Sequence, residues 1–195
     1  MHKHILAFLL LLSLFACNKD KTQTAPADKA AEQSTVNLMV DGNARSFIVY
    51  LPIGYNNAGQ MPMIFVIHGG SGTPEGMMTL ANFKTIADRD KVVLVYPAGI
   101  QNNWNDGRPT APNQLGIDDV GFFNQLCDYM IANHPVDGSR IYATGISNGG
   151  FMSSRLGCEL SQRIAAIAVD AATMEATTIA PNCNPGRPEI GRAHV

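Results

Sequence analysis

Five consecutive residues, Gly145 to Gly149, form the pattern GxSxG around Ser147. They follow an apolar run, IYAT, and precede a stretch with helical character, which is the context that holds a serine on a sharp strand-to-helix turn. A serine hydroxyl is a weak nucleophile unless it is held exposed beside a base, and a helix N-terminus favours developing negative charge. The pattern predicts that Ser147 is a nucleophile; the alternative is a glycine-rich turn in which the serine only caps a helix.

A second glycine-rich loop, His68 to Gly72, follows the apolar run MIFVI. Two backbone N–H groups, one after the nucleophile and one from such a loop, can bind the negative oxygen of an acyl-transfer intermediate. We therefore expect an oxyanion hole made by the N–H groups of Asn148 and of Gly70 or its neighbour Ser71, which is also a candidate substrate contact. His68 is expected to be structural, because the order of catalytic residues that accompanies this turn is serine, acid, histidine.

The segments that must position these residues alternate between strand and helix patterns. Turn residues Asp41 to Asn43 join the first two strands in a hairpin, and a polar insertion between Pro97 and Gly116 is a candidate substrate-binding loop. The alternation predicts one α/β domain with a mostly parallel sheet and helices on both faces. The expected strands are Val36 to Val40, Phe47 to Leu51, Met63 to Ile67, Val92 to Tyr96, Arg140 to Thr144 and Ile164 to Val169, and the expected helices lie near Met77 to Asp88, Val120 to Asn133 and Gly150 to Leu160.

Four stretches carry a resemblance to a known family: VIHGGSG, VVLVYPAG with WNDGRP after it, IDDVGFFNQL, and PVDGSRIYATGISNGGFMSSRLGCEL. They closely resemble the polyhydroxybutyrate depolymerase-like and feruloyl esterase-like hydrolases of the first carbohydrate esterase family, over most of residues 47–188. The resemblance implies an α/β-hydrolase fold and a secreted enzyme that needs no metal or cofactor. Its substrates would be esters of hydroxyalkanoate polymers, or aromatic or acetyl esters on plant polysaccharides. It also places Trp104 near the substrate cleft, with a hydrophobic anchor for the long loop as the alternative.

The acidic residues before the nucleophile are in the wrong order to serve as the catalytic acid. Asp106, Asp118 and Asp119 are therefore expected to cap helices or stabilise loops. Asp170 ends the strand after the nucleophile helix and is a possible acid. The methionines Met77, Met78 and Met152 are expected to pack in the core or a pocket rather than to hold a metal.

The catalytic acid and base of the resembled family lie downstream, in motifs similar to HGxAD and GxxHxW, and neither motif occurs in this chain. The histidine that follows Ser147 is His194, within the ending IGRAHV. That ending is the translation of a nucleotide sequence that resembles a common sequencing adapter, so residues 190–195 are expected to be an assembly artefact. Residues 36–189 are then roughly the N-terminal two-thirds of a hydrolase domain, without its final strands and helices. Such a fragment is expected to be inactive.

The N-terminus resembles a lipoprotein signal. Lys3 is followed by the apolar run Ile5 to Phe15, and then by Ala16 and Cys17. These features predict a signal peptide over residues 1–16, a lipid on Cys17 and a flexible tether over residues 17–35. The alternative is an ordinary signal peptide with a chance cysteine. An exported protein is expected, either extracellular or a lipoprotein of the outer membrane or cell surface.

Charge and cysteine content limit the possible partners. The formal net charge is −2 with scattered Lys and Arg, so nucleic acid is not expected to bind, and a membrane is expected to contact the protein only through the lipid anchor. Cys127, Cys158 and Cys183 follow Cys17. The family resemblance implies a disulfide between Cys158 and Cys183, with two free thiols as the alternative.

Three functions are considered for a chain with this sequence. The leading hypothesis is an exported serine ester hydrolase that forms an acyl-enzyme on Ser147. The rival is a surface lipoprotein that keeps the fold only to bind a polymer. A peptidase of the same fold is disfavoured by the SNGG and WNDGR segments. Fold and nucleophile indicate the reaction class, while loops determine which ester is cleaved.

Overall fold

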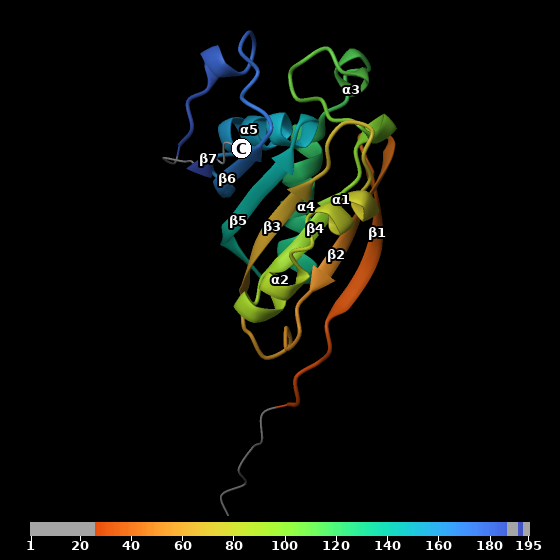
Figure 1. Ribbon diagram of the computed structural model, residues 1–195, viewed down its shortest axis with the longest axis vertical. Helices are drawn as coiled ribbons and strands as arrows, with labels where there is room; N and C mark the ends of the chain where they lie inside the picture. Colours follow the sequence, from red (N-terminus) through yellow and green to blue (C-terminus); the bar gives the residue numbers. More distant parts are fainter. Residues whose placement is uncertain (1–25, 187–190, 193–195) are drawn as a thin grey trace, which may run out of the picture.

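The computed structural model describes residues 26–186 and the backbone of residues 191 and 192, and it contains a seven-stranded mixed sheet (Figure 1). The strand order is β1-β2-β4-β3-β5-β6-β7. The pairs β1/β2 and β2/β4 are antiparallel, and all later neighbours are parallel. The strands are β1 Glu32–Val40, β2 Asn43–Leu51, β3 Met61–Ile67, β4 Val93–Pro97, β5 Val136–Ile146, β6 Ile164–Asp170 and β7 Gly191–Arg192.

Helices cover the sheet from both sides (Figure 1). Alternate residues of β2 enter different cores: Phe47 and Val49 pack with α4 and α5, whereas Ile48 and Tyr50 pack with α1 and α2. This two-residue period is the reason that one strand can serve two apolar layers. The helices are α1 Pro74–Leu80, α2 Lys84–Asp90, α3 Ala111–Gln114, α4 Asp119–Asn133 and α5 Asn148–Glu159, with 3-10 turns at Ile100–Asn102 and Ala180–Asn182.

The predicted fold is confirmed, including the hairpin, whose turn places Asp41 and Gly42 at φ of 48° and 77°. One predicted helix is wrong: Met77 to Asp88 is not continuous but divides into α1 and α2. Thr73 caps α1 by accepting from the Gly76 N–H at 3.1 Å. The chain turns between the two helices. The apolar pattern therefore predicts helical structure correctly in this region but not its division into two helices.

The domain also begins earlier than expected. β1 starts at Glu32, inside the segment predicted to be a tether up to residue 35. Upstream of it, the Lys29 N–H donates to the Asn56 side chain at 2.8 Å, and the Asn57 side chain donates to the Pro26 carbonyl. The signal peptide and the lipid on Cys17 were predicted on residues that lie outside the described part.

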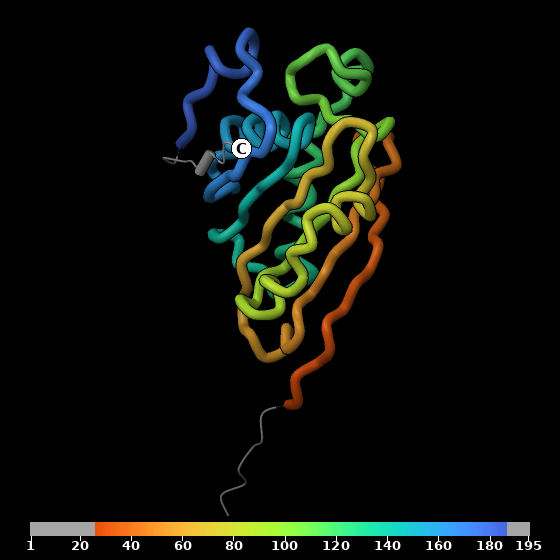
Figure 2. The backbone as a smooth tube through the Cα atoms, in the orientation of Figure 1, coloured from red at the N-terminus to blue at the C-terminus, as the bar shows by residue number. Residues whose placement is uncertain are grey.

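The tube trace shows that the loops after β4 and β6 rise at the same end of the sheet (Figure 2). This is the end to which the parallel strands point, because each of these loops follows the carboxyl end of its strand. In open α/β sheets, ligands bind at that edge. Ser147 follows β5 and therefore lies there too.

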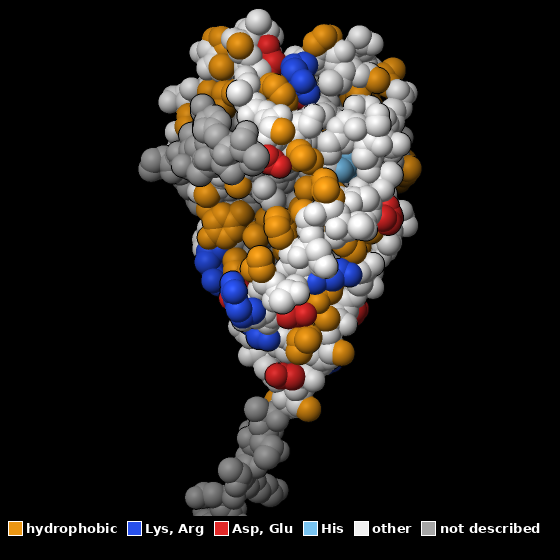
Figure 3. Space-filling model, in the orientation of Figure 1, with side chains coloured by type: hydrophobic (Ala, Val, Ile, Leu, Met, Phe, Trp, Pro, Cys, Tyr) orange, Lys and Arg blue, Asp and Glu red, His pale blue; other side chains and the backbone are white. Residues whose placement is uncertain are grey.

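An open apolar surface lies elsewhere, on the sheet face that carries α1 and α2. These helices pack over β3 and β4, and beside them a cavity of about 420 Å³ extends over β5 and β6. Orange side chains gather there in the space-filling view (Figure 3). The cavity is lined by Ile64, Phe83, Tyr142, Ala143, Thr144, Ala166, Ile167 and Ala168.

Asp118→Ala is expected to lower the free energy of unfolding by about 1 kcal/mol. The exposed Asp118 carboxylate caps α4, accepting from the Gly121 N–H at 2.8 Å, and alanine removes that acceptor. Urea denaturation measures the change. Asp118→Ser, which retains a capping oxygen, should recover most of the loss, and an alanine variant as stable as the parent contradicts the assignment.

Candidate active site

Ser147 occupies a strained turn between β5 and α5. Its backbone has φ 53° and ψ −121°. This conformation is unfavourable in free energy for any residue other than glycine. The Ser147 N–H donates to the Asp170 carbonyl at 3.0 Å, and its own carbonyl accepts from the Phe151 N–H at 2.9 Å. Ser147 is exposed, whereas Ile146 before it is half-buried and Asn148 after it is buried. The turn therefore holds Ser147 at the surface in a fixed backbone conformation.

Close backbone contacts explain the glycines of this turn. A Cβ on Gly149 would lie 2.3 Å from the Ile67 carbonyl oxygen and 2.4 Å from that of His68. A Cβ on Gly145 would lie 2.5 Å from the backbone of Gly149. The first turn of α5 thus presses directly on the end of β3, where the second glycine-rich loop begins.

Backbone strain is concentrated at this end of the sheet. Of the seven residues other than glycine with positive φ in the described part, five follow the carboxyl ends of β3, β4, β5 and β6. Such strain persists only where the surrounding structure enforces it, and it clusters at functional sites. The five are Ser71, Gln101, Asn102, Ser147 and Ala171.

Two backbone N–H groups lie next to the turn. The Asn148 N–H belongs to the first turn of α5, where no intrahelical acceptor exists. A Cβ on Gly70 would lie 3.8 Å from the Cβ of Asn148, so the two residues are neighbours. The Ser71 N–H instead donates to the Asn102 carbonyl at 2.8 Å. Of the two candidates in this loop, Gly70 is therefore the one that can pair with Asn148.

Trp104 is fully buried and packs against His68, with 4.8 Å between ring centroids. Its indole N–H donates to the His68 carbonyl at 2.9 Å. A side chain with no exposed surface cannot contact a substrate. Trp104 lies near the Ser147 turn, as the resemblance implies, but its complete burial makes it an anchor for the long loop rather than a direct substrate contact.

The Asn148 side chain holds that loop as well. Its Oδ1 accepts from the Trp104 N–H at 2.8 Å, and its Nδ2 donates to the Trp104 carbonyl at 3.2 Å and to Asp106 at 2.6 Å. The sequence singled out only the backbone of Asn148. A buried amide beside the WND segment is a tertiary arrangement that no local pattern indicates.

His68 is structural. The Gly99 N–H donates to its Nε2 at 3.1 Å, and its Nδ1 lies 2.7 Å from the Gly69 carbonyl, so the ring carries its proton on Nδ1. Burial lowers the pKa of His68, which keeps the ring neutral. His134 precedes β5, whose stretch from Val136 to Gly145 runs alongside six residue steps of β3, so about 20 Å or more separates it from Ser147. Within the described residues, neither histidine can serve as the base; His194 lies outside them.

The three early aspartates stabilise helices and loops, as expected. Asp118 caps α4, and the fully buried Asp106 accepts two hydrogen bonds from the Arg108 guanidinium. Asp119 pairs with Arg45 at 2.7 Å and accepts from the Asn105 N–H at 2.7 Å. Burial raises the pKa of Asp119, and Arg45 opposes the rise. This buried pair fixes the start of α4 against β2.

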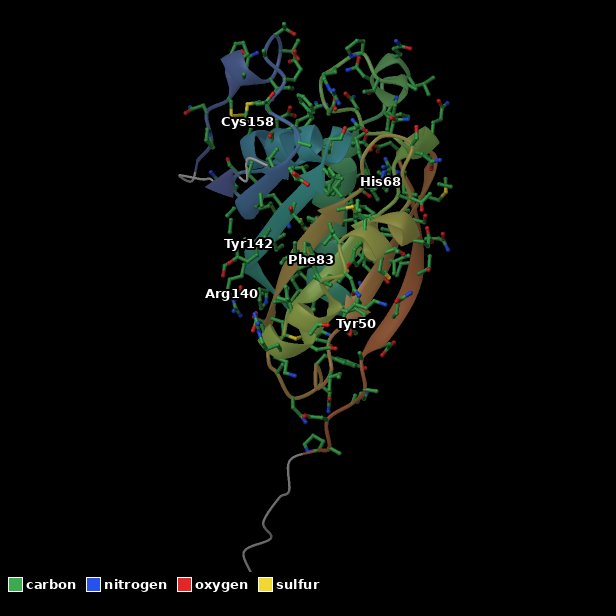
Figure 4. The ribbon with its side chains drawn as sticks, viewed as in Figure 1. Tyr50, His68, Phe83, Arg140, Tyr142 and Cys158 are labelled. Atoms are coloured by element: carbon green, nitrogen blue, oxygen red, sulfur yellow. A yellow bond between two sulfur atoms is a disulfide. The ribbon has the colours of Figure 1, made fainter. Side chains whose placement is uncertain are left out.

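The loop after β6 is braced from two sides. A disulfide joins Cys158 in α5 to Cys183, with 5.3 Å between Cα atoms (Figure 4). The Glu175 carboxylate accepts from the hydroxyl and backbone N–H groups of Thr177 and of Thr178, and these bonds lower its pKa. Cys127 is a buried free thiol. Glu175 is not among the predicted site residues, although an acidic residue followed closely by two threonines is a signal for such a turn.

The methionines pack in the core. Met77 belongs to the layer under α1, and Met152 is fully buried under α5. Among the residues that the structure describes, no group of three or more His, Cys, Asp or Glu side chains is arranged to hold a metal ion. None of the described helices has the length and apolar character needed to span a bilayer.

The model of the family described as esterase PHB depolymerase matches residues 45–179, which is more than half of the chain. The chain belongs to the esterase PHB depolymerase family. Feruloyl esterase D of Neurospora crassa is 24% identical over 184 residues, which cover 87% of this chain and 61% of that protein. Feruloyl esterase B of Piromyces equi is 29% identical and the match covers 74% of this chain and 27% of that protein. The chain thus spans about three-fifths or less of these relatives.

Solved structures show the same fold. The S-formylglutathione hydrolase of Staphylococcus aureus superposes with a TM-score of 0.62 at 16% identity, over 75% of this chain and 59% of that one. At this identity the likeness establishes the fold alone. The chain therefore has the α/β-hydrolase fold of a family of esterases.

Gly149→Ala is expected to lower the free energy of unfolding by about 3 kcal/mol or more, because the new methyl group would collide with two carbonyl oxygens. Gly76→Ala is the matched control. Its Cβ would meet nothing closer than Thr73 Oγ1 at 3.4 Å, and alanine favours the helix. Thermal or urea unfolding of both variants tests this, and equal stabilities would contradict it.

His68 is expected to make the protein less stable in acid. The pKa of the folded histidine is lowered by burial, so on acidification the unfolded chain binds the proton first, near pH about 6.5. Stability from this residue is present above that pH and is lost as the pH falls toward the folded pKa. Between about pH 7.5 and about pH 5, the parent should lose more stability than His68→Gln.

His134 remains in both proteins, so its own titration cancels in that comparison. The free energy of unfolding is measured by denaturation at each pH. If it depends on pH equally in the parent and in His68→Gln, the pKa of His68 does not differ between the folded and unfolded states, and the prediction is contradicted.

Proposed function

We propose that this chain carries the nucleophile and oxyanion hole of a serine carboxylic ester hydrolase. The observation that carries the proposal is the exposed Ser147 on a strained turn, beside the N–H groups of Asn148 and Gly70. An orphan N–H pair next to an exposed nucleophile suits acyl transfer, in which charge develops on the carbonyl oxygen. The family membership and the names of the relatives support the same reaction class.

In the proposed reaction, Ser147 Oγ attacks the ester carbonyl carbon and loses its proton to a base. The carbonyl π electrons move onto oxygen, and the N–H groups of Gly70 and Asn148 bind the resulting oxyanion. Collapse expels the alcohol, which takes the proton from the base, and leaves an acyl-enzyme on Ser147; water then repeats the sequence and releases the acid. Each oxyanion donor typically contributes about 3 to 4 kcal/mol of transition-state stabilisation.

The base belongs to residues outside the described part, because neither described histidine can reach Ser147 with a free ring nitrogen. Asp170 ends β6 at the same sheet edge and is the proposed acid if no downstream residue takes that role. The greater length of the relatives supports a base and an acid supplied by a longer form of the protein.

The proposed substrates are polyhydroxyalkanoate esters or feruloyl and acetyl esters of plant polysaccharides. The family description and the relatives' names support these two classes. The braced loops after β4 and β6 flank Ser147 and are the proposed determinants of the choice between them. No cofactor takes part in the proposed mechanism, and the partner is the ester substrate.

We place the protein outside the cytoplasm, as a secreted or outer-membrane lipoprotein anchored through Cys17. The apolar run of residues 5–15 and the cysteine after Ala16 support this proposal. Nucleic acid is not a proposed partner. Metabolic labelling with a fatty acid analogue tests the anchor, since Cys17→Ala should abolish incorporation of the label.

The 195-residue chain is expected to show no measurable hydrolysis of p-nitrophenyl acetate, whereas a form extended through the segment present in the relatives should be active. Loss of a catalytic base costs on the order of 10⁴ to 10⁶ in turnover. In the active form, Ser147→Ala should abolish hydrolysis, and the control Ser139→Ala, on an exposed serine hydrogen-bonded to Asp137, should not.

Two outcomes would overturn parts of the proposal. Turnover by the 195-residue chain that disappears in Ser147→Ala would show that a base exists among its residues. An extended protein that binds a polyester or polysaccharide but hydrolyses no ester would instead favour the alternative function, a polymer-binding surface lipoprotein.

A further inference from the structure

The loop after β4 connects the two halves of the proposed oxyanion hole. The Trp104 backbone pairs with the Asn148 side chain through both its N–H and its carbonyl, at 2.8 and 3.2 Å. The indole N–H of the same residue reaches the His68 carbonyl at 2.9 Å, two residues before Gly70. One residue therefore holds both donor-bearing segments, although they come from different strands.

The connection is buried and its hydrogen bonds are satisfied. Asn148 and Asp106 are 4% and 0% exposed, and the second bond of Asn148 Nδ2 goes to Asp106 at 2.6 Å. Arg108 balances the charge of Asp106, with Nη2 at 2.6 Å from the carboxylate. Thr110 Oγ1 donates to the Trp104 carbonyl at 2.8 Å. A buried polar network whose hydrogen bonds are all made is rigid, and breaking one member leaves polar groups unpaired.

We propose that residues 104–106, called the strut from here on, set the spacing between the Gly70 and Asn148 N–H donors. Trp104, Asp106 and the side chain of Asn148 are then positioning residues, which act on the reacting atoms through those two backbone groups. This inference rests on the proposed function. It gives the WND segment a positioning role, which differs both from contacting the substrate and from packing a tryptophan in the core.

The geometry around Gly70 supports the strut. A Cβ on Gly70 would lie 3.0 Å from Asn103 Oδ1, so the residue before Trp104 borders the second donor directly. Asn103 is itself held by a bond from its Nδ2 to the Gln101 carbonyl at 2.8 Å. A shift of the strut would therefore move the surroundings of both donors together.

A positioning role predicts a specific kinetic signature. Negative charge is absent from the carbonyl oxygen of the bound ester and develops on it in the transition state, so a displaced donor weakens binding of the transition state more than binding of the substrate. In the extended, active form, Asp106→Ala should lower kcat about 10- to 100-fold and leave KM within about threefold. Asp106→Asn retains an acceptor for Asn148 Nδ2 and should recover most of the loss.

Trp104→Phe isolates the second connection. Phenylalanine keeps the aromatic packing on His68 and Phe123 and leaves the backbone bonds to Asn148 in place, but it removes the indole N–H. We expect kcat to fall about 10-fold with KM little changed.

The matched control for Asp106→Ala is Asp118→Ala. It removes an aspartate that touches no member of the strut and should leave kcat unchanged.

Amide hydrogen exchange supplies a readout that needs no activity. Asp106→Ala should raise exchange in peptides covering residues 67–72 and residues 147–150 together, whereas Asp118→Ala should raise neither. Trp104 is the single tryptophan of the chain, so its fluorescence reports in the same samples whether the strut stays buried. Increased exchange in both peptides with a buried indole supports the inference.

The possible failures are distinguishable. Hydrolysis that does not depend on Ser147 contradicts the proposed function, and the exchange data still decide whether the strut couples the two loops. Unchanged kcat in Asp106→Ala, unchanged exchange, or an equal loss in Asp118→Ala would each overturn the strut. A rise in KM with constant kcat would assign these residues to substrate binding and would overturn it as well.

Discussion

The contact between the first turn of α5 and the end of β3 is the constraint on which the rest of the site depends. Gly149 lies so close to the carbonyls of Ile67 and His68 that no other residue fits there. This contact brings the Ser147 turn and the glycine-rich loop together, although they belong to different crossover units. The parallel pairing of β3 with β5 makes the contact possible, because it places both carboxyl ends at one edge. Backbone strain at Ser147 is tolerated since this packing holds the turn on both sides.

Features encoded locally could be predicted from the sequence. The Ser147 turn, the loop ending at Gly72 and the buried strands all carry short patterns, and the structure places each one where the pattern indicated. The family resemblance implied a pairing of Cys158 with Cys183, and the structure joins them. The break between α1 and α2 was missed because the apolar positions continue across it, so that periodicity alone indicated a single helix.

Features that depend on tertiary contacts could not be predicted. From the sequence, a lone tryptophan in a polar loop is as consistent with a substrate contact as with a hydrophobic anchor for the loop. Only the complete burial of Trp104 decides between the two. The side chain of Asn148 showed no signal, since its partners lie about forty residues earlier in the chain. Likewise, the pairing of Arg45 with Asp119 joins residues 74 apart. Long-range polar contacts of this kind leave no periodicity in the sequence.

His68 shows why residue type and proximity do not make a catalytic base. It lies in the loop against the nucleophile turn, where a Cβ on the next residue would be 3.6 Å from the Ser147 Cβ. Its Nδ1 proton is used by the Gly69 carbonyl and its Nε2 lone pair by the Gly99 N–H, so no ring nitrogen is free to accept the serine proton. The same two bonds stabilise the loop that carries Gly70 and orient the carbonyl that holds Trp104. Because both ring nitrogens of His68 are engaged in fixing this loop, the residue that takes the proton of Ser147 in the proposed reaction must be a different one.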